Sequence, residues 1–173
     1  MKAVVTEQEF LMPTLPTLLH VGHVVPDLDV AARQLVELWG GTPIPLPEEL
    51  GPSVTDGAVP AFDLPYTEAT LKGEPARFTA RYGFVEVGGI QIELIQPVVG
   101  PTPYDTFLQA VGAGIHHFAY IVEDIEAHLV PWYAEHPDTP LLLDARLQGG
   151  IRVVYVEYAI EGTVFELIQR DAF

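Results

Sequence analysis

A short pattern occurs twice in this chain, and each copy carries a histidine at its start and a glutamate near its end. The first copy begins with His20-Val-Gly-His-Val-Val-Pro-Asp and ends with Ile-Glu93-Leu-Ile-Gln. The second begins with His117-Phe-Ala-Tyr-Ile-Val-Glu-Asp and ends with Phe-Glu166-Leu-Ile-Gln. Because a duplicated unit puts equivalent residues at equivalent places, the chain is expected to fold as two similar halves that bring these four side chains into matching positions.

Each half shows the same predicted order of elements: a strand, a helix and about three further strands. In the first half, β-branched residues predict a strand at 18–25, and the apolar spacing predicts an amphipathic helix at 28–39 with Asp27 as its N-cap. A hairpin is predicted at 78–87 and 90–95. The second half repeats this order at 115–122, 125–135, 141–144, 151–158 and 163–168.

Two segments carry signals that break regular structure. Residues 42–76 are rich in Pro and Gly and are predicted to be mostly loop, in which Phe62 and Tyr66 either pack or cover a pocket. Pro131 lies inside the second helix and is expected to kink or shorten it. The predicted organisation is an N-terminal tail at 1–17 and one domain at 18–173, with module one at 18–97, a linker at 98–113 containing a short helix at 104–111, and module two at 114–170.

The composition is that of one globular domain. Of the 173 residues, 49% are hydrophobic and 18% are charged. No apolar run approaches the roughly 18 residues of a membrane span, and the first residues lack the pattern of a signal peptide. The chain has no cysteine, so a cytoplasmic location is the default expectation.

The charge balance narrows the class of partner. The formal net charge is −16, and the eight Lys and Arg residues are scattered along the chain. Nucleic-acid binding requires a basic footprint, which this sequence lacks. We therefore expect no nucleic-acid or membrane partner; neutral small molecules and metal cations fit this charge best.

The paired His and Glu residues predict a metal site. Side chains alternate between the two faces of a strand, so Glu93 and Glu166 lie on strands whose other residues are mostly apolar. A buried carboxylate costs several kcal/mol unless it is paired, and a shared cation would pair both. With His20 and His117, the four ligands suit one divalent ion, either Zn, Fe, Mn, Co or Ni, and leave coordination positions open in a six-coordinate site.

Four other charged or titratable residues have less specific interpretations. His23 and His116 each neighbour a candidate ligand, but strand alternation predicts that they face the opposite side and support the structure. Arg81 and Arg152 occupy similar places in the two halves. Either arginine could bind a substrate carboxylate, and a surface ion pair is the alternative.

The motifs His-Val-Gly…Val-Pro-Asp-Leu, Gly-Ile-His-His117-Phe-Ala and Glu-Leu-Ile-Gln resemble those of the vicinal oxygen chelate superfamily of glyoxalases, bleomycin-resistance proteins and extradiol dioxygenases. The resemblance covers residues 18–169. It implies an α+β fold in which two tandem βαβββ modules form one cup-shaped mixed β-sheet with helices outside. In glyoxalase and epimerase members, one His and one Glu or Gln from each half hold a divalent metal, and these positions fall on His20, Glu93, His117 and Glu166. Related proteins are often dimers, so a homodimer is one expected state.

Three functions are compatible with this resemblance. Residues 92–97 and 114–119 look most like the methylmalonyl-CoA epimerase branch, which implies a metal-dependent isomerase, epimerase or lyase acting on a small carbonyl compound, with Glu93 or Glu166 as the catalytic base. No basic cluster is present for the phosphates of coenzyme A. The second function is an Fe(II)-dependent ring-cleaving dioxygenase, and the third is a non-catalytic small-molecule binding or resistance protein.

Overall fold

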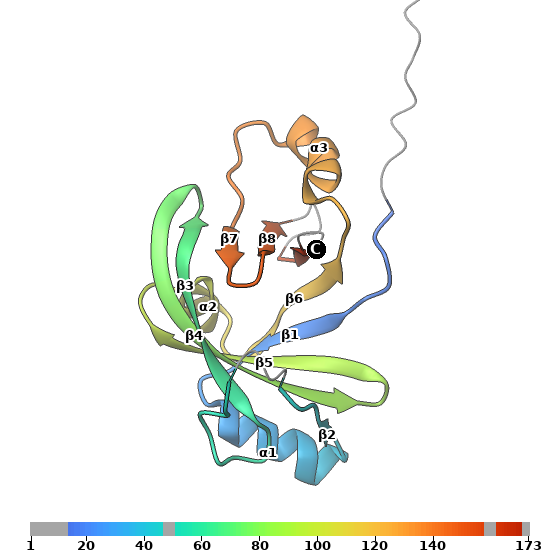
Figure 1. Cartoon of the computed structure of the whole chain (residues 1–173), viewed down its shortest axis with the longest axis vertical. Helices are drawn as coiled ribbons and strands as arrows, with labels where there is room; N and C mark the ends of the chain where they lie inside the picture. Colours follow the sequence, from blue (N-terminus) through green and yellow to red (C-terminus); the bar gives the residue numbers. More distant parts are fainter. Residues whose placement is uncertain (1–13, 47–50, 158–161, 171–173) are drawn as a thin grey trace, which may run out of the picture.

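The computed structural model describes residues 14–46, 51–157 and 162–170 (Figure 1). Most of the predicted tail at 1–17 therefore lies outside the described residues. The elements in chain order are β1 (His20–Val24), α1 (Leu28–Trp39), β2 (Thr42–Pro43), β3 (Ala61–Leu71), β4 (Glu74–Val87), β5 (Ile90–Val99), α2 (Pro103–Ala110), β6 (Gly114–Ile121), α3 (Ile125–Glu135), β7 (Leu143–Leu147), β8 (Ile151–Glu157) and β9 (Val164–Arg170).

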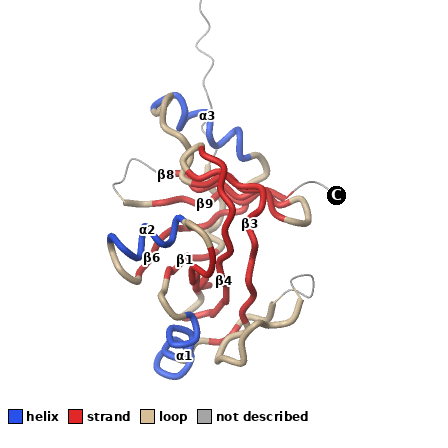
Figure 2. The backbone as a smooth tube through the Cα atoms, turned by 90° about the vertical axis from the view of Figure 1, so that its left-hand side faces the viewer, coloured by secondary structure: helices blue, strands red, loops and turns tan. Residues whose placement is uncertain are grey.

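Within the described part of the chain, nine strands form one mixed sheet in the order β2-β4-β3-β7-β8-β9-β6-β1-β5. An additional pairing between β4 and β5 joins the two ends of this order, so the sheet curves round and closes. Helices α1 and α3 lie outside it, at opposite ends of the molecule (Figures 1 and 2). The predicted α+β class and curved mixed sheet are confirmed.

The two halves of the sheet follow the duplication in the sequence. β1 pairs in parallel with β5 in the first half, as β6 pairs in parallel with β9 in the second. The halves meet at two places in the sheet, where β1 pairs with β6 and where β3 pairs with β7, both in antiparallel fashion. The exact module boundaries remain a prediction.

Both long helices begin at the aspartates that precede them. The Asp27 side chain accepts a hydrogen bond from the backbone N–H of Val30, and the Asp124 side chain accepts one from Ala127. α1 ends at Gly40, whose φ of 67° belongs to the left-handed region. Each helix buries an apolar face against the outside of the sheet; the buried members are Leu28 and Ala32 in α1, and Ile125, Leu129 and Trp132 in α3.

Helix α3 has the predicted bounds of 125–135, and of the two effects expected from Pro131, a kink or a shortening, shortening does not occur. Leu129 and Trp132, on either side of the proline, are almost fully buried. The Trp132 indole also donates a hydrogen bond to the Glu157 carbonyl at 3.0 Å. Packing at this site therefore outweighs the backbone hydrogen bond that proline cannot make.

The sequence predicts residues 42–76 to be mostly loop with short extended pieces, but β3 is a long strand that takes up eleven of them and pairs with β4 in a long hairpin. Phe62 and Tyr66 are buried inside the closed sheet, so they pack in the core. The turn between the strands is Lys72-Gly73, where both residues have positive φ, as a tight hairpin requires. Residues 47–50 lie outside the described structure.

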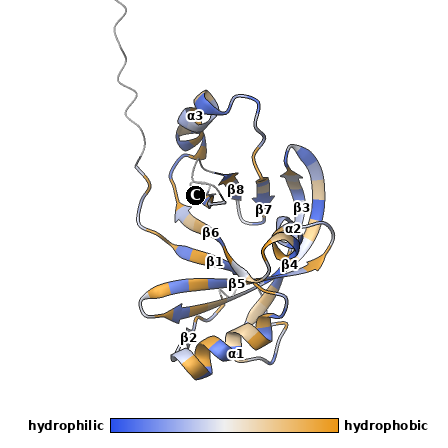
Figure 3. Cartoon of the chain, turned by 180° about the vertical axis from the view of Figure 1, so that it is seen from behind, coloured by the Kyte–Doolittle hydropathy of each residue, from blue (hydrophilic) through white to orange (hydrophobic). Residues whose placement is uncertain are grey.

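Strand alternation gives the sheet an interior and an exterior face, and β5 alternates visibly between hydrophobic and hydrophilic residues (Figure 3). The interior holds an aromatic-rich core to which both halves contribute, including Phe62, Tyr66, Phe78, Tyr82, Tyr104 and Tyr155. No helix among the described residues is long and apolar enough to cross a bilayer.

Candidate metal centre

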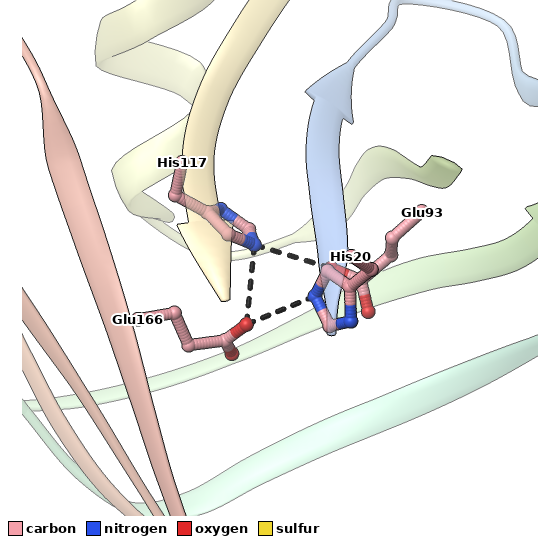
Figure 4. Close-up of side chains that lie close together, drawn as sticks. All are labelled: His20, Glu93, His117 and Glu166. Carbon is pink, nitrogen blue, oxygen red and sulfur yellow. Dashed lines mark hydrogen bonds and ion pairs between the residues drawn. The ribbon is translucent and has the colours of Figure 1, made fainter. Parts of the chain in front are cut away.

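The four residues of the duplicated motif come together on four adjacent strands. Glu166 lies on β9, His117 on β6, His20 on β1 and Glu93 on β5, which is also the order of these strands in the sheet. Their side chains converge on one point inside the fold (Figure 4). The pairing of β1 with β6 thus joins the ligand pair of one half to that of the other.

The distances between the donor atoms suit a shared cation. His20 Nε2 lies 3.0 Å from Glu166 Oε2 and 3.3 Å from Glu93 Oε2. His117 Nε2 lies 3.2 Å and 3.4 Å from the same two oxygens. Ligand atoms about 2.1 Å from one ion would be separated by roughly 3.0 Å in an octahedral arrangement and roughly 3.4 Å in a tetrahedral one. One donor atom from each residue lies within 4.8 Å of all the others.

Burial makes the cluster costly without a further partner. His20, Glu93, His117 and Glu166 are 0–7% exposed. Even so, Glu93 Oε2 and His117 Nε2 make no hydrogen bond within the described structure. One cation placed between them would satisfy both the carboxylate oxygen and the imidazole nitrogen. This donor set therefore fits a divalent metal.

Without a metal, the cluster holds charge of both signs. Burial alone would lower the pKa of His20, but the charges and hydrogen bonds of Glu93 and Glu166 raise it to about 10. The same carboxylates raise the pKa of His117 against its burial. Burial opposes ionisation of both glutamates, yet the histidines hold the pKa of each carboxyl below its usual value. Metal binding must therefore displace protons from the imidazoles.

Gly22 provides the space for the His117 ring. It lies opposite His117 in the β1–β6 ladder. A Cβ atom at position 22 would lie 2.1 Å from His117 Cε1 and 2.3 Å from His117 Nε2. Any side chain here would overlap the imidazole, so glycine is needed because the ring packs directly on the β1 backbone.

The prediction that His116 faces away from the cluster is wrong. The β1–β6 register shifts between Gly22 and His23, which leaves His116 as an extra residue in β6. This bulge interrupts side-chain alternation and lets His116 and His117 lie together, with their Nδ1 atoms 3.1 Å apart. His116 is buried, and burial together with the charge of His117 lowers its pKa to about 3. The Nδ1 atom of a neutral His116 can therefore accept a hydrogen bond from the Nδ1–H of His117, which leaves His117 Nε2 free to bind a metal.

His23 follows the prediction. It is half-buried on the outer side of β1 and lines a pocket with Pro26, Val30 and Trp39 of the α1 region. Burial lowers its pKa. His23 therefore belongs to the helix-covered face and has no contact with the four-residue cluster.

Both candidate arginines make ion pairs. Arg81 makes two hydrogen bonds to Asp63, at 2.7 and 3.1 Å. Arg152 makes two to Asp144, at 3.0 and 2.9 Å, and one to Glu126 at 2.6 Å. Of the two interpretations offered by the sequence, the structure favours the ion pair for each guanidinium.

A chain of tyrosine hydroxyls beside the cluster was missed from the sequence. Tyr66, Tyr82, Tyr104 and Tyr155 are linked end to end by hydrogen bonds between their OH groups. Tyr104 is placed by the start of α2, where the Thr102 hydroxyl accepts a hydrogen bond from the backbone N–H of Asp105. Burial raises the pKa of all four phenols, so they are protonated at neutral pH.

The sequence matches the glyoxalase/bleomycin resistance protein/dioxygenase superfamily over residues 19–136. Among curated proteins it is similar to the uncharacterized protein YqjC of Bacillus subtilis (strain 168), with 30% identity over 53 residues. That match spans 31% of this chain and only 38% of the relative.

The fold is shared with solved structures of low sequence identity. The hypothetical protein BH1468 from Bacillus halodurans C-125 is 18% identical, with a TM-score of 0.57 over 91% of this chain and 96% of that one. Methylmalonyl-CoA epimerase from Mycobacterium tuberculosis is 19% identical, with a TM-score of 0.56 over 94% and 95%. The Streptomyces coelicolor enzyme of the same name, in complex with 2-nitronate-propionyl-CoA, is 18% identical, with a TM-score of 0.58 over 92% and 100%. The chain belongs to the glyoxalase/bleomycin resistance protein/dioxygenase superfamily.

Proposed function

We propose that this protein is a divalent-metal-dependent isomerase, epimerase or lyase that acts on a small carbonyl compound. The observation that carries the proposal is the buried cluster of two histidines and two glutamates, in which Glu93 Oε2 and His117 Nε2 make no hydrogen bond within the described structure. Membership of the superfamily and the fold shared with epimerases support the same class of chemistry.

Each residue of the cluster has a defined role in this proposal. His20, Glu93, His117 and Glu166 would hold the ion, and a divalent ion bound there would supply Lewis-acid polarisation of a carbonyl group. Polarisation acidifies the C–H bond beside the carbonyl, and a carboxylate within reach can then remove that proton and return it. His20 and His117 remain in place throughout.

Glu93 is the better candidate for the base. Its Oε2 lies 3.3 and 3.4 Å from the two imidazoles, compared with 3.0 and 3.2 Å for Glu166 Oε2. Glu93 Oε2 also falls outside hydrogen-bonding geometry in the described structure, whereas Glu166 Oε2 accepts a hydrogen bond from His20 Nε2 at 3.0 Å. The less tightly held carboxylate is the one that can leave the ligand set with least rearrangement.

The fourth ligand separates this proposal from the dioxygenase alternative. A facial triad of His20, His117 and Glu166 would leave three positions of an iron centre for oxygen and substrate. Glu93 lies at nearly the same distances as Glu166 and would fill one of these positions. Four protein ligands suit isomerase or lyase chemistry, in which only substrate oxygens need to enter.

Elemental analysis of gently purified protein tests the proposal. We expect one divalent ion per chain in the wild type and loss of the ion in His20→Ala and Glu166→Ala. His23→Ala is the matched control, because His23 lies on the same strand but faces the helix side. An ion-free wild type after reconstitution, or His20→Ala with full metal content, would contradict the assignment and leave the binding protein as the better interpretation.

Proton exchange separates metal binding from catalysis. Glu93→Gln keeps a neutral oxygen donor but removes the base, so this variant should retain metal and lose exchange of the C–H proton beside a carbonyl in D₂O. Glu166→Gln is the control for the same chemical change. If exchange persists in Glu93→Gln and disappears in Glu166→Gln, Glu166 is the base instead.

A further inference from the structure

The tyrosine chain is a continuous polar path through an otherwise apolar core. The OH group of Tyr82 lies 2.7 Å from that of Tyr66 and 2.9 Å from that of Tyr104, and Tyr104 OH lies 2.8 Å from Tyr155 OH. All four side chains are at most 3% exposed. They come from β3, β4, α2 and β8, so both halves of the protein contribute.

Counting hydrogens shows that the chain is incomplete by one acceptor. Four phenols carry four hydroxyl hydrogens, and the three OH–OH contacts use three of them. Whatever the direction of donation, one hydrogen remains, and no other side chain or backbone carbonyl of the described residues accepts it. A buried donor without an acceptor is unfavourable, so the chain is poised to donate to an oxygen from outside it.

The Tyr155 end of the chain adjoins the candidate metal centre. The Tyr155 ring centroid is 4.9 Å from that of His117, and Tyr155 pairs with Glu166 in the β8–β9 ladder. At the other end, Tyr66 stacks on Phe78 with a centroid distance of 4.3 Å. Tyr155 is therefore the member of the tyrosine chain that packs against a residue of the cluster within the described structure.

No buried lysine or arginine accompanies these phenols in the described part of the chain; the positive charge beside them belongs to the imidazoles of the cluster, where a metal ion would replace it. Arg81 and Arg152 are engaged by Asp63, and by Asp144 and Glu126. No Lys or Arg is buried within the described part of the chain. The other described basic residues have exposed side chains; they are Arg33, Lys72, Arg77, Arg146 and Arg170. A phosphate or a carboxylate remote from the metal would find no positive partner inside the fold.

We propose that the substrate is a small uncharged carbonyl compound and that Tyr155 donates a hydrogen bond to one of its oxygens. This inference rests on the metal-dependent function proposed above. In the bound state donation runs in one direction, from Tyr66 to Tyr82, to Tyr104, to Tyr155 and then to the substrate. Each bond in such a series polarises the next, so Tyr155 becomes a stronger donor than an isolated phenol.

The donor acts where charge develops. When the base takes the proton from the carbon beside the carbonyl, the electron pair of that C–H bond moves toward the carbonyl oxygen. A phenol that donates to this oxygen stabilises the developing charge, and returning the proton to carbon restores a neutral molecule. Tyr155 is thus a specificity-determining residue, because it favours a neutral acceptor where a basic residue would favour an anion.

The test uses the full chain loaded with Co²⁺, whose d–d absorption reports both metal occupancy and ligand binding. The two probes are dihydroxyacetone and dihydroxyacetone phosphate, which share the same hydroxycarbonyl group and differ in one phosphate. We expect the Kd of dihydroxyacetone to be at least tenfold lower. Tyr155→Phe should weaken its binding by about three- to tenfold, as expected for one hydrogen bond, without loss of Co²⁺.

Tyr133→Phe is the matched control. It also removes one phenol hydroxyl, but Tyr133 is 39% exposed on α3 and lies outside the chain of four tyrosines, so binding should change less than twofold. Equal or tighter binding of the phosphate ester, wild-type affinity in Tyr155→Phe, or the same loss in both variants would overturn this inference while the metal function stands. Failure of the wild type to bind Co²⁺, or full Co²⁺ binding by His20→Ala, would instead overturn the proposed function.

Discussion

Replacing Gly22 with alanine should abolish tight metal binding without touching a ligand residue. The new Cβ would lie 2.1 Å from His117 Cε1, whereas unstrained carbon atoms approach to about 3.5 Å. The overlap is roughly 1.4 Å, so the imidazole must move by about that amount. Metal–ligand distances tolerate only about 0.2 Å, and His117 Nε2 would therefore be lost as a ligand.

We expect the affinity for a divalent ion to fall at least about 100-fold, the upper end of what displacing a supporting group costs. Overpacking should also lower the free energy of unfolding by about 1–3 kcal/mol. Competition with a chromophoric chelator measures the first quantity and thermal unfolding measures the second.

Gly114→Ala is the control for this experiment. Gly114 lies in the same β1–β6 ladder, but its Cβ would meet only Phe107, at 3.8 Å, which is ordinary contact. Metal affinity in this variant should equal that of the wild type. If Gly22→Ala binds metal as tightly as Gly114→Ala, the packing of His117 on the β1 backbone is not what positions the ligand.

Three further outcomes are expected. Because its pKa is raised to about 10, protonated His20 stabilises the metal-free fold fully below about pH 6.5, and this stabilisation is lost as the pH rises through about 10. A metal must displace that proton, so metal affinity measured by chelator competition should increase between about pH 6.5 and about pH 10. An affinity that does not change with pH would contradict the ion-paired cluster. His116→Leu should weaken metal binding about 10- to 100-fold and His116→Asn, which keeps an acceptor, should recover part of it; equal affinities in the two variants would refute the role of the His116–His117 hydrogen bond. Pro131→Ala should raise the free energy of unfolding by roughly 1 kcal/mol or more, because it restores a helical hydrogen bond, and it should leave metal affinity unchanged. Thermal unfolding measures this; a lower unfolding temperature would show that the proline ring itself is needed for packing.

The regular parts of the fold were predictable because they follow local rules. The helix at 28–39 has the predicted bounds, since Asp27 and Gly40 mark both its ends. The grouping of the four His and Glu residues followed from the duplication alone, because equivalent strands of a repeated unit carry equivalent side chains to the same region. Their metal binding remains a proposal.

The features that were missed depend on contacts between distant segments. Strand β3 contains Pro65 and follows a Pro- and Gly-rich stretch, and its pairing with β4 and β7 outweighs those local signals. The bulge at His116 arises from a one-residue mismatch between β1 and β6, which neither strand reveals by itself. In the tyrosine chain, a single OH–OH contact joins Tyr104 and Tyr155, which are 51 positions apart in the sequence. Each tyrosine viewed singly is typical of core packing.

The candidate metal ligands and the tyrosine chain lie on different elements of the fold. The four donor residues lie on the contiguous strands β9, β6, β1 and β5, whereas the tyrosines come from β3, β4, β8 and α2. None of the four donor atoms comes from the elements that carry the tyrosines. In the proposed function, substitutions at the tyrosines would change which molecule is accepted while the four candidate ligands stay in place. The scaffold would in this way diverge toward new substrates in a single mutational step, without passing through a form that cannot bind the proposed ion.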